Sequence, residues 1–275
     1  MNDNGGKVRE EEGLTMLTEE RYQYIIDRLA QQGLVKSQDL MKETNSSEST
    51  IRRDLDVLEK RGLLARVHGG AKRVYEVEQE LPVTEKTLKN VHEKKEIAQY
   101  AATMISDGDT IFLDAGTTTL YMIPFLKHKK IRIVTNAVQQ ASLLADQNND
   151  VILIGGVLKN TTKAVIGTIG LNQLSQYRFN KAFLGINGID IEYGLTTPDP
   201  EEAAIKKQAV KNSAKVFILA DKTKFNKITF DKVDDIDNAI IISNQLDRTE
   251  FEAYFKATTI MEVKHDLHSN IKSVD

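Results

Sequence analysis

The chain has 275 residues, of which 40% are hydrophobic, and a formal net charge of -3, so it is long enough to fold into two domains with sizeable cores. It has neither an apolar run of about 20 residues nor a secretory signal, which predicts a cytoplasmic protein without a membrane-spanning segment. Its lack of cysteine excludes disulfides and thiol catalysis, and its five histidines have no zinc-binding spacing, so neither a metal nor another cofactor is expected.

Residues 1–16 (MNDNGGKVREEEGLTM) are rich in acidic residues and glycine, contain few apolar residues and show no periodicity. Such a segment buries too little surface to offset the entropy lost on ordering, so a disordered extension is predicted. Met16 stands directly before the first periodic segment, which leaves Met1 and Met16 as alternative starts of translation.

Three helices are predicted between residues 17 and 62. The first, in LTEERYQYIIDRLAQQG, has apolar residues at helical spacing, a cap at Thr18 and a terminal glycine. The second follows Ser37 as its cap, and the third begins at Ser46 or Ser47 and ends before Gly62. Two short helices joined by a few polar residues, after a longer one, indicate a helix-turn-helix.

The third helix is predicted to have one face for the core and one for a partner. Ile51, Leu55 and Leu58 are spaced to lie on the buried face. A helix of this kind can enter the major groove of double-stranded DNA, where arginine donates two hydrogen bonds to guanine and hydroxyls contact bases or phosphates. The outward face carries Ser49, Thr50, Arg52, Arg53 and Asp56.

A β-hairpin is predicted after the third helix, from residues 63–67, an HGG turn and residues 71–74. It lies in a basic segment, KRGLLARVHGGAKR (60–73), which contains no acidic residue although the whole chain is mildly acidic. We interpret the hairpin as a wing whose cations contact DNA phosphates; for any single residue, a solvated surface charge or a salt bridge is the alternative. The predicted DNA-binding residues are Ser47, Ser49, Thr50, Arg52, Arg53, Arg66, His68, Lys72 and Arg73.

The pattern Arg21, Ile25 and Leu29, followed by SESTIRRDLDVLEKRGLLARVHGGA, resembles the winged helix-turn-helix of DeoR-type bacterial transcription repressors. The resemblance covers residues 17–74. It implies a DNA-binding domain over this range, which agrees with the interpretation of the helices and the wing.

Residues 75–93 are polar and irregular, contain Pro82 and are predicted to be a linker. Residues 94–265 then show short apolar runs, most of them separated by amphipathic helices. Because these runs are rich in valine and isoleucine and do not alternate, they predict a parallel sheet covered on both faces, hence a second, α/β domain. The runs are TIFLDA (110–115), IRIVTN (131–136), VILIGG (151–156), KAFLGI (181–186), KVFILA (215–220) and NAIIIS (238–243), and residues 266–275 are assigned to a tail.

Small and polar residues follow several of these strands, and open parallel sheets bind ligands at the carboxyl ends of their strands. The segment DAGTTT (114–119) opens a helix, and its glycine, hydroxyls and first backbone N–H groups suit an anion such as phosphate. An ordinary helix cap is the alternative for this segment alone. The predicted effector-binding residues are Asp114, Gly116, Thr117, Thr118, Thr119, Thr135, Asn136, Gly155, Gly156, Asn187, Gly188, Thr197, Glu202, Lys206, Asp221 and Lys224.

The second half of the chain resembles the DeoR-type sensor domain through GDTIFLDAGTTT, TNA, IGG, GLTTPDPEEAAIKKQA and LADKTKF. The resemblance implies a fold like that of ribose-5-phosphate isomerase and a phosphorylated sugar as effector. Within the family, SESTIRRDL, RVHGGA, DAGTTTLYMI, QYRFNKAFLG and GLTTPDPEEA look most like the repressors of fructose phosphotransferase operons. For that subgroup the implied inducer is fructose 1-phosphate.

The function expected from this organisation is a repressor, not an enzyme, that binds operator DNA as a homodimer or homotetramer and releases it when a sugar phosphate binds. The first alternative is a sugar-phosphate isomerase, which needs a carboxylate base. The segment LGINGID, however, has Gly185, Asn187 and Gly188 where the isomerase pattern carries acids, and only Glu201 and Glu202 remain nearby in sequence. A second alternative, an architectural DNA-binding protein, leaves the α/β domain without a role.

Overall fold

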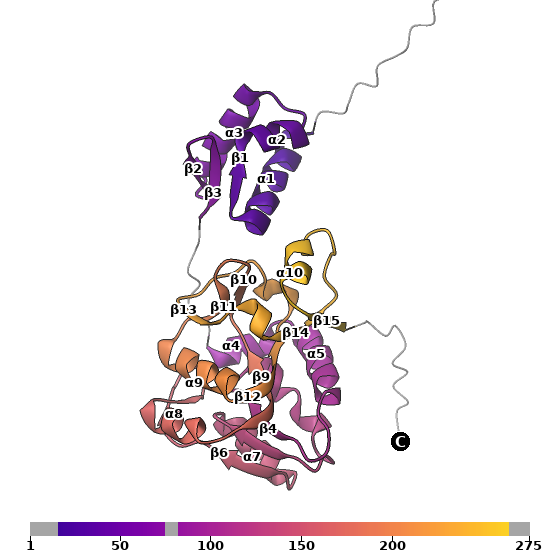
Figure 1. Ribbon diagram of the computed structural model, residues 1–275, viewed down its shortest axis with the longest axis vertical. Coiled ribbons are helices and arrows are strands. Elements are labelled where there is room, and N and C mark those ends of the chain that lie inside the picture. Colours follow the sequence, from indigo (N-terminus) through magenta and orange to yellow (C-terminus); the bar gives the residue numbers. More distant parts are fainter. Residues whose placement is uncertain (1–15, 75–81, 264–275) are drawn as a thin grey trace, which may run out of the picture. The chain divides into compact units, whose positions relative to one another are not determined.

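The computed structural model describes residues 16–74 and 82–263, and the chain divides into two compact units between Tyr75 and Glu76 (Figure 1). The predicted disordered extension, apart from Met16, and the predicted tail lie outside the described residues.

The N-terminal unit is a winged helix-turn-helix, as predicted. Its three helices are followed by a hairpin whose second strand also pairs with a short strand after the first helix, giving an antiparallel sheet of order β1-β3-β2. That short strand was not predicted. The elements are α1 (Thr18–Gln32), β1 (Leu34–Lys36), α2 (Ser37–Glu43), α3 (Glu48–Lys60), β2 (Leu64–Val67) and β3 (Gly70–Arg73).

The starts of the helices confirm one predicted cap and contradict two. Ser47 caps α3, because its hydroxyl accepts a hydrogen bond from the Thr50 backbone N–H at 3.2 Å. The predictions for Thr18 and Ser37 were wrong, since both are the first helical residue of their helix. Before α2 the chain arrives from β1, and the Ser37 N–H donates to the Gly69 carbonyl in the wing, so a tertiary contact takes the place of a side-chain cap.

The core of the N-terminal unit lies between its helices and its sheet. The predicted inward face of α3 is confirmed, since Ile51, Leu55 and Leu58 are buried against Ile25 of α1 and Leu40 of α2. This packing leaves the opposite face of α3 exposed to solvent.

The C-terminal unit is built on a seven-stranded parallel sheet of order β15-β14-β12-β9-β4-β5-β6. All six predicted apolar runs are strands of this sheet, which confirms the α/β fold. The seventh strand, at one edge, was not predicted. The strands are β4 (Thr110–Leu113), β5 (Arg132–Thr135), β6 (Asp150–Leu153), β9 (Phe179–Gly185), β12 (Ser213–Leu219), β14 (Ile240–Asn244) and β15 (Ile260–Val263).

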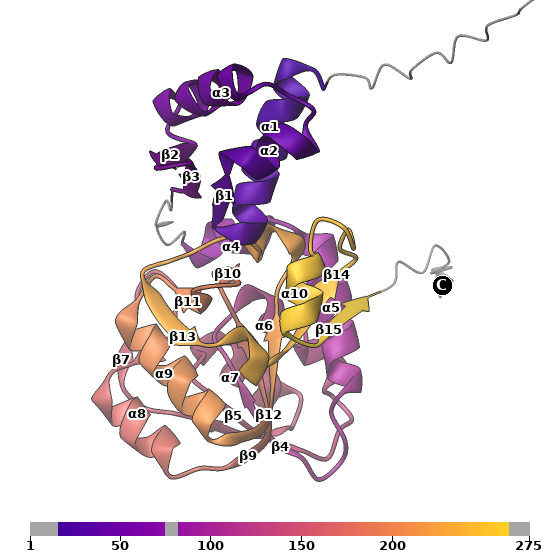
Figure 2. The same cartoon turned by 45° about the horizontal axis from the view of Figure 1, so that its top comes forward.

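Helices cover both faces of this sheet (Figures 1 and 2). On one face α5 and α7 bury Ile97 and Leu144, and on the other face α8, α9 and α10 bury Leu174, Ile205 and Tyr254. No helix of the described residues is long and apolar enough to cross a membrane. The helices are α4 (Val83–Leu88), α5 (Val91–Thr103), α6 (Thr117–Leu120), α7 (Val138–Asp146), α8 (Thr168–Ser175), α9 (Pro200–Lys211) and α10 (Glu252–Ala257), with short 3-10 turns η1 (Ile123–Phe125), η2 (Lys222–Lys224) and η3 (Ile236–Asn238).

The C-terminal unit also contains two smaller sheets. One is a hairpin of β7 (Val157–Leu158) and β8 (Val165–Ile166), and the other has the order β10-β11-β13. The members of the second are β10 (Gly188–Asp190), β11 (Gly194–Thr197) and β13 (Asp231–Asp234).

The segment predicted as a linker, residues 75–93, is not irregular throughout. It contains α4 and the first residues of α5. The N–H of Val83, the first residue of α4, donates to the Thr161 carbonyl between β7 and β8 at 3.0 Å, so α4 belongs to the C-terminal unit.

Candidate functional site

The outer face of α3 presents two arginines in the arrangement expected of a helix that reads DNA. Arg52 and Arg53 are both exposed, and neither guanidinium has a hydrogen-bond or ion-pair partner among the described residues. Of the three predicted hydroxyls, that of Ser47 lies 2.9 Å from the Ser49 hydroxyl and 2.8 Å from the Thr50 hydroxyl. These hydroxyls therefore order the start of α3.

The cations of the wing differ in what they contact. His68 and Lys72 are exposed, whereas Arg73 is half-buried. The guanidinium of Arg66 forms an ion pair with Asp56 of α3, and its backbone N–H donates to Glu59 at 2.8 Å. Arg66 thus holds the wing to α3, a contact that the sequence did not reveal.

A buried ion pair connects α1 to α3. The Arg21 Nε lies 2.5 Å from Asp54 Oδ2, and the exposed fractions of the two side chains are only 6% and 4%. A further Arg21 nitrogen donates to the Met16 carbonyl at 2.9 Å. The hydrogen bond that Arg21 donates to Asp54 raises the pKa of Arg21 above its usual value, and the pair joins α1 to α3 inside the unit.

A pocket of about 330 Å³ lies at the carboxyl ends of the central strands of the C-terminal unit. From β4 the chain adds β5 and β6 on one side of the sheet, and from β9 onward it adds strands on the other side. The pocket is lined by the residues that follow β4 and β9, among them Asp114 and Asn187. Ligands of open α/β sheets bind at such a switch point in strand order.

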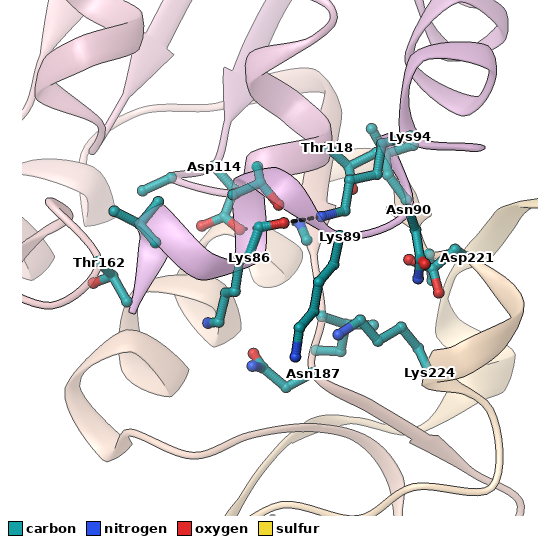
Figure 3. A pocket seen from close by; sticks show the side chains of 18 of the residues that line it. Lys86, Lys89, Asn90, Lys94, Asp114, Thr118, Thr162, Asn187, Asp221 and Lys224 are labelled. Carbon is teal, nitrogen blue, oxygen red and sulfur yellow. Dashed lines mark hydrogen bonds between the residues drawn. The ribbon is translucent and has the colours of Figure 1, made fainter. Parts of the chain in front are cut away.

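The floor of the pocket is a buried ion pair (Figure 3 labels Asp114 among the lining residues). The Nζ of Lys206, on α9, donates to the Asp114 carboxylate, and the Gly185 N–H donates to the same oxygen at 3.0 Å. Asp114 is 2% exposed and Lys206 is 5% exposed. This contact holds the ends of β4 and β9 and the middle of α9 together beneath the pocket.

A group of lysines surrounds the pocket. Lys94 of α5 is 4% exposed, and its Nζ donates to the Lys86 carbonyl at the end of α4. Burial, opposed by the charge of Asp221 and aided by those of Lys224 and Lys86, lowers the pKa of Lys94 to about 8. The lysines that line the pocket are Lys86, Lys89, Lys94, Lys206, Lys224 and Lys227.

Polar groups complete the wall of the pocket. Asp221 follows β12 and accepts from the Thr223 N–H at 3.0 Å, which shapes the turn η2. The Asn187 side chain accepts from the Thr197 hydroxyl at 3.1 Å. The hydroxyl of Thr229 is buried, and it has no hydrogen-bond partner among the described residues.

Nine of the sixteen predicted effector-binding residues line this one pocket although they are spread over more than 100 positions of sequence. They come from the segment after β4, the segment after β9, α9 and the turn after β12. They are Asp114, Gly116, Thr117, Thr118, Asn187, Glu202, Lys206, Asp221 and Lys224.

The other seven predicted residues do not line the pocket. Three of them form hydrogen bonds with the backbone around it. The Thr119 hydroxyl donates to the Asp114 carbonyl at 2.7 Å, and the Thr135 hydroxyl donates to the Leu113 carbonyl at 2.6 Å. Asn136 accepts from the Ala115 N–H at 3.0 Å. The rest of the seven are Gly155, Gly156, Gly188 and Thr197.

Two of these glycines are required by close backbone contacts. A Cβ on Gly188 would lie 2.4 Å from the Lys227 carbonyl oxygen, and one on Gly156, whose φ is +148°, would lie 2.5 Å from the Ile166 oxygen. Some of the small residues at strand ends are therefore explained by tight backbone packing and not by contact with a ligand.

Several lining residues escaped prediction. Lys86 lies in α4, Lys89 and Asn90 lie between α4 and α5, and all three belong to the segment predicted as a linker. Lys94, in the first turn of α5, opens the range assigned to the α/β domain but was not among the predicted site residues. A buried lysine on α5 has a detectable signal, because Lys94 lies three residues before Ile97 on the same helical face. The remaining missed residues are Val83, Ala115, Thr162, Gly185, Ile186, Leu219, Ala220, Thr223, Lys227 and Thr229.

The chain is similar to known regulators over nearly all of its length. Residues 21–77 match the family described as "DeoR-like helix-turn-helix domain", and residues 89–245 match that described as "DeoR C terminal sensor domain". An uncharacterized HTH-type transcriptional regulator, FruR, of Bacillus subtilis (strain 168) is 46% identical over 90% of this chain and 100% of its own length. The lactose phosphotransferase system repressor of Lactococcus lactis subsp. lactis is 34% identical over 88% of this chain and 97% of its own.

Among solved structures, ribose 5 phosphate isomerase A from Neisseria gonorrhoeae is similar to this chain with a TM-score of 0.37 and 19% sequence identity. The similarity covers 48% of this chain and 52% of the isomerase.

Proposed function

The chain belongs to the DeoR family of helix-turn-helix regulators, and on this premise we propose that it represses a sugar uptake and utilisation operon and releases its operator when a phosphorylated sugar binds. The effector we propose is fructose 1-phosphate. The observation that carries the proposal is a lysine-lined pocket at the switch point of the sensor sheet, in a chain whose other unit exposes two adjacent arginines on α3.

The charge of the pocket supports a phosphate ester as the ligand. Six lysines line it against three carboxylates, Asp114, Glu202 and Asp221, which gives a formal excess of three positive charges. A phosphate ester carries about -1.5 to -2 charges at pH 7, so it neutralises much of this excess. The lysines and the first backbone N–H groups of α6 are the donors that we assign to the phosphate.

The sugar is assigned from a different part of the pocket and from the relatives. Asn187 and Thr229 offer an amide and a hydroxyl, groups that bind sugar hydroxyls. The 46% identical relative is named FruR and the relative from Lactococcus lactis subsp. lactis is named a lactose phosphotransferase system repressor. The second name supports a sugar that is phosphorylated by a phosphotransferase system during uptake, and the first supports fructose as that sugar.

The carboxylates of the pocket argue against an isomerase. A catalytic base must be available to a substrate proton, but Asp114 is paired with Lys206, and Glu202 accepts from Thr162 at 2.6 Å and from Lys159 at 3.0 Å. The third carboxylate, Asp221, is buried and accepts from the Thr223 N–H at 3.0 Å. Residues 185–187, at the end of β9 and directly after it, line the pocket, and none of them is acidic. Aldose–ketose isomerase assays of the purified chain are expected to show no turnover.

Repression and release follow from two arrangements of an oligomer with different affinities for the effector. Arg52 and Arg53 read the major groove, while the wing cations fix the register on phosphates. The effector weakens DNA binding only if it binds the DNA-incompetent arrangement more tightly. A release of about 30- to 150-fold corresponds to a coupling free energy of about 2 to 3 kcal/mol.

The test of the effector is isothermal titration calorimetry of the full chain with fructose 1-phosphate, fructose 6-phosphate, fructose and inorganic phosphate. We expect fructose 1-phosphate to bind at least tenfold more tightly than fructose 6-phosphate, and fructose to give no heat. Binding of fructose without the phosphate, or no heat from any sugar phosphate, would contradict the proposal. The matched control is Lys94→Met against Lys95→Met, because Lys94 lines the pocket and its exposed neighbour does not.

A further inference from the structure

A buried glutamine contacts the wall of the effector pocket without lining the pocket itself. Gln140 belongs to α7, one of the helices that cover the sheet (Figure 2), and is 5% exposed. Its Nε2 lies 3.0 Å from the carbonyl oxygen of Asp114, 3.2 Å from that of Gly116 and 3.3 Å from the Thr119 hydroxyl. Residues 114–118 line the pocket, so Gln140 supports from behind a segment that a ligand meets from the front.

Gln140 is one of the contacts that join this segment, which we call the 114–119 loop, to the rest of the unit. Within the loop, the Gly116 N–H donates to the Asp114 carbonyl at 2.9 Å, and the Thr119 hydroxyl lies 2.7 Å from the Asp114 carbonyl and 2.8 Å from the Gly116 carbonyl. These contacts give the loop its shape but move with it. The amide of Gln140 comes from a helix that packs on the sheet through Leu144, so it fixes the position of the loop.

The amide of Gln140 must turn its nitrogen toward the loop. Carbonyl oxygens only accept hydrogen bonds, whereas the amide nitrogen of glutamine carries two hydrogens. The Thr119 hydroxyl has a single hydrogen and can donate to only one of the two carbonyls at a time. Gln140 can donate to both carbonyls at once, which the hydroxyl cannot do.

The orientation of the Gly116 carbonyl decides what the loop presents to the pocket. The C=O and N–H of a trans peptide point in opposite directions. The carbonyl that Gln140 binds therefore directs the N–H of Thr117 to the other side, where Thr117 lines the pocket. A peptide turned the other way would present an oxygen to an anion. The N–H groups of Thr117 and Thr118 have no hydrogen-bond partner among the described residues.

The side chain of Thr118 is an independent sign that a ligand binds beside this loop. It is 7% exposed and lines the pocket (Figure 3), and its hydroxyl has no hydrogen-bond partner within the part of the chain that the structure describes. Buried hydroxyls are ordinarily hydrogen-bonded. A phosphate oxygen is a strong acceptor for such a donor.

We propose that Gln140 is a positioning residue for the phosphate group of the effector. It touches no atom of the effector. Its amide holds the 114–119 loop so that the N–H of Thr117 and the hydroxyl of Thr118 meet the phosphate. This role rests on the proposed function, because it requires a phosphorylated ligand in the pocket.

The test compares two variants that each remove one buried side-chain amide. Gln140→Met keeps an unbranched side chain of similar length but loses the donor. The control is Asn212→Leu. The amide of Asn212, which is 4% exposed, donates to the Leu174 carbonyl at 2.8 Å. Asn212 lies beside Phe179, the first residue of β9, whereas the pocket lies at the other end of that strand.

Three quantities are measured for the wild type and both variants: the melting temperature, the affinity for fructose 1-phosphate by calorimetry, and the 31P resonance of the bound ligand. We expect Gln140→Met to bind at least fivefold more weakly, with the resonance moved toward that of the free ligand, because the contacts with the phosphate are lost. Asn212→Leu should melt at a lower temperature but keep the affinity and the resonance of the wild type.

If the wild type binds, three results overturn the role of Gln140: unchanged affinity in Gln140→Met, an unchanged 31P resonance in that variant, or an equal loss of affinity in Asn212→Leu. A wild type that binds no sugar phosphate contradicts the proposed function and removes this role with it.

If Gln140→Met does not fold, Gln140→Asn takes its place. It keeps the amide but is one methylene shorter, so it cannot reach both carbonyls of the loop. Its affinity for fructose 1-phosphate is expected to fall at least fivefold, and wild-type affinity in this variant overturns the role of Gln140.

Discussion

Binding of a phosphorylated sugar is predicted to take up a proton above pH 7, because Lys94 is partly neutral in the free protein. Its pKa is about 8, so the side chain is neutral in about a tenth of molecules at pH 7, about half at pH 8 and about nine tenths at pH 9. A phosphate in the pocket favours the charged form and raises this pKa. The bound state then holds more protons than the free state, so affinity falls as pH rises through 8, approaching about tenfold per pH unit.

The assay is isothermal titration calorimetry with fructose 1-phosphate in pairs of buffers that have different ionisation enthalpies. We expect little net uptake at pH 7, where binding of the phosphate dianion itself releases a small fraction of a proton, and an uptake that rises toward one proton between pH 8 and pH 9. In Lys94→Met this uptake should disappear, whereas Lys95→Met, altered at an exposed neighbour outside the pocket, should keep it. Tight binding with no proton uptake at pH 8 in the wild type would refute the role given to Lys94.

Three further predictions concern the DNA-binding face, the pocket and the buried ion pair. Replacing Arg52 or Arg53 with alanine should cost about 1 to 3 kcal/mol of DNA-binding free energy and relax the preference at one base pair. Lys72→Ala should instead weaken binding to all DNA sequences alike and reduce the salt dependence of binding. A double alanine variant of Arg52 and Arg53 that binds the operator as tightly as the wild type would refute the assignment. Gly116→Val should leave DNA binding intact and prevent release, since a Cβ there would already lie 3.2 Å from the Thr119 hydroxyl and 3.4 Å from the Cα of Gly185 at the end of β9. Release at the wild-type concentration of sugar phosphate would place the effector elsewhere. Asp54→Ala should destabilise the N-terminal unit by about 3 to 5 kcal/mol, because it leaves a buried arginine unpaired. Unchanged unfolding of this unit, followed by scanning calorimetry, would show that the pair is not buried in solution.

The elements of the fold were predictable where a local pattern determines them. Six apolar runs became strands of one parallel sheet, because a strand buried on both faces needs such a run wherever it lies. Ser47 was predictable as a cap for a similar reason, since the hydrogen bond joins residues three apart. The edge strand β15 was not predicted, because its residues are only half-buried and its composition mixes polar and apolar residues.

Contacts between distant residues were not predictable in this way. Asp54 and Arg21 are 33 positions apart. The helical spacing of α3 places Asp54 on the same face as Ile51 and Leu58, but it does not identify Arg21 as its partner. The pocket was located through the small residues after β4 and β9, but Lys86 and Lys89 were assigned to a linker and Lys94 of α5 was not among the predicted residues. The local sequence shows lysine only as a polar residue. The packing of α4 and of α5 against α6 is what makes these lysines part of the pocket wall.

The measurement that tests the central claim most directly is the fluorescence anisotropy of labelled operator DNA, selected with the full chain from genomic fragments, as fructose 1-phosphate is added. The account predicts that the sugar phosphate lowers DNA affinity by about 30- to 150-fold, and that fructose at the same concentration has no effect. Unchanged operator affinity at a concentration of fructose 1-phosphate that saturates the protein in calorimetry would contradict the account.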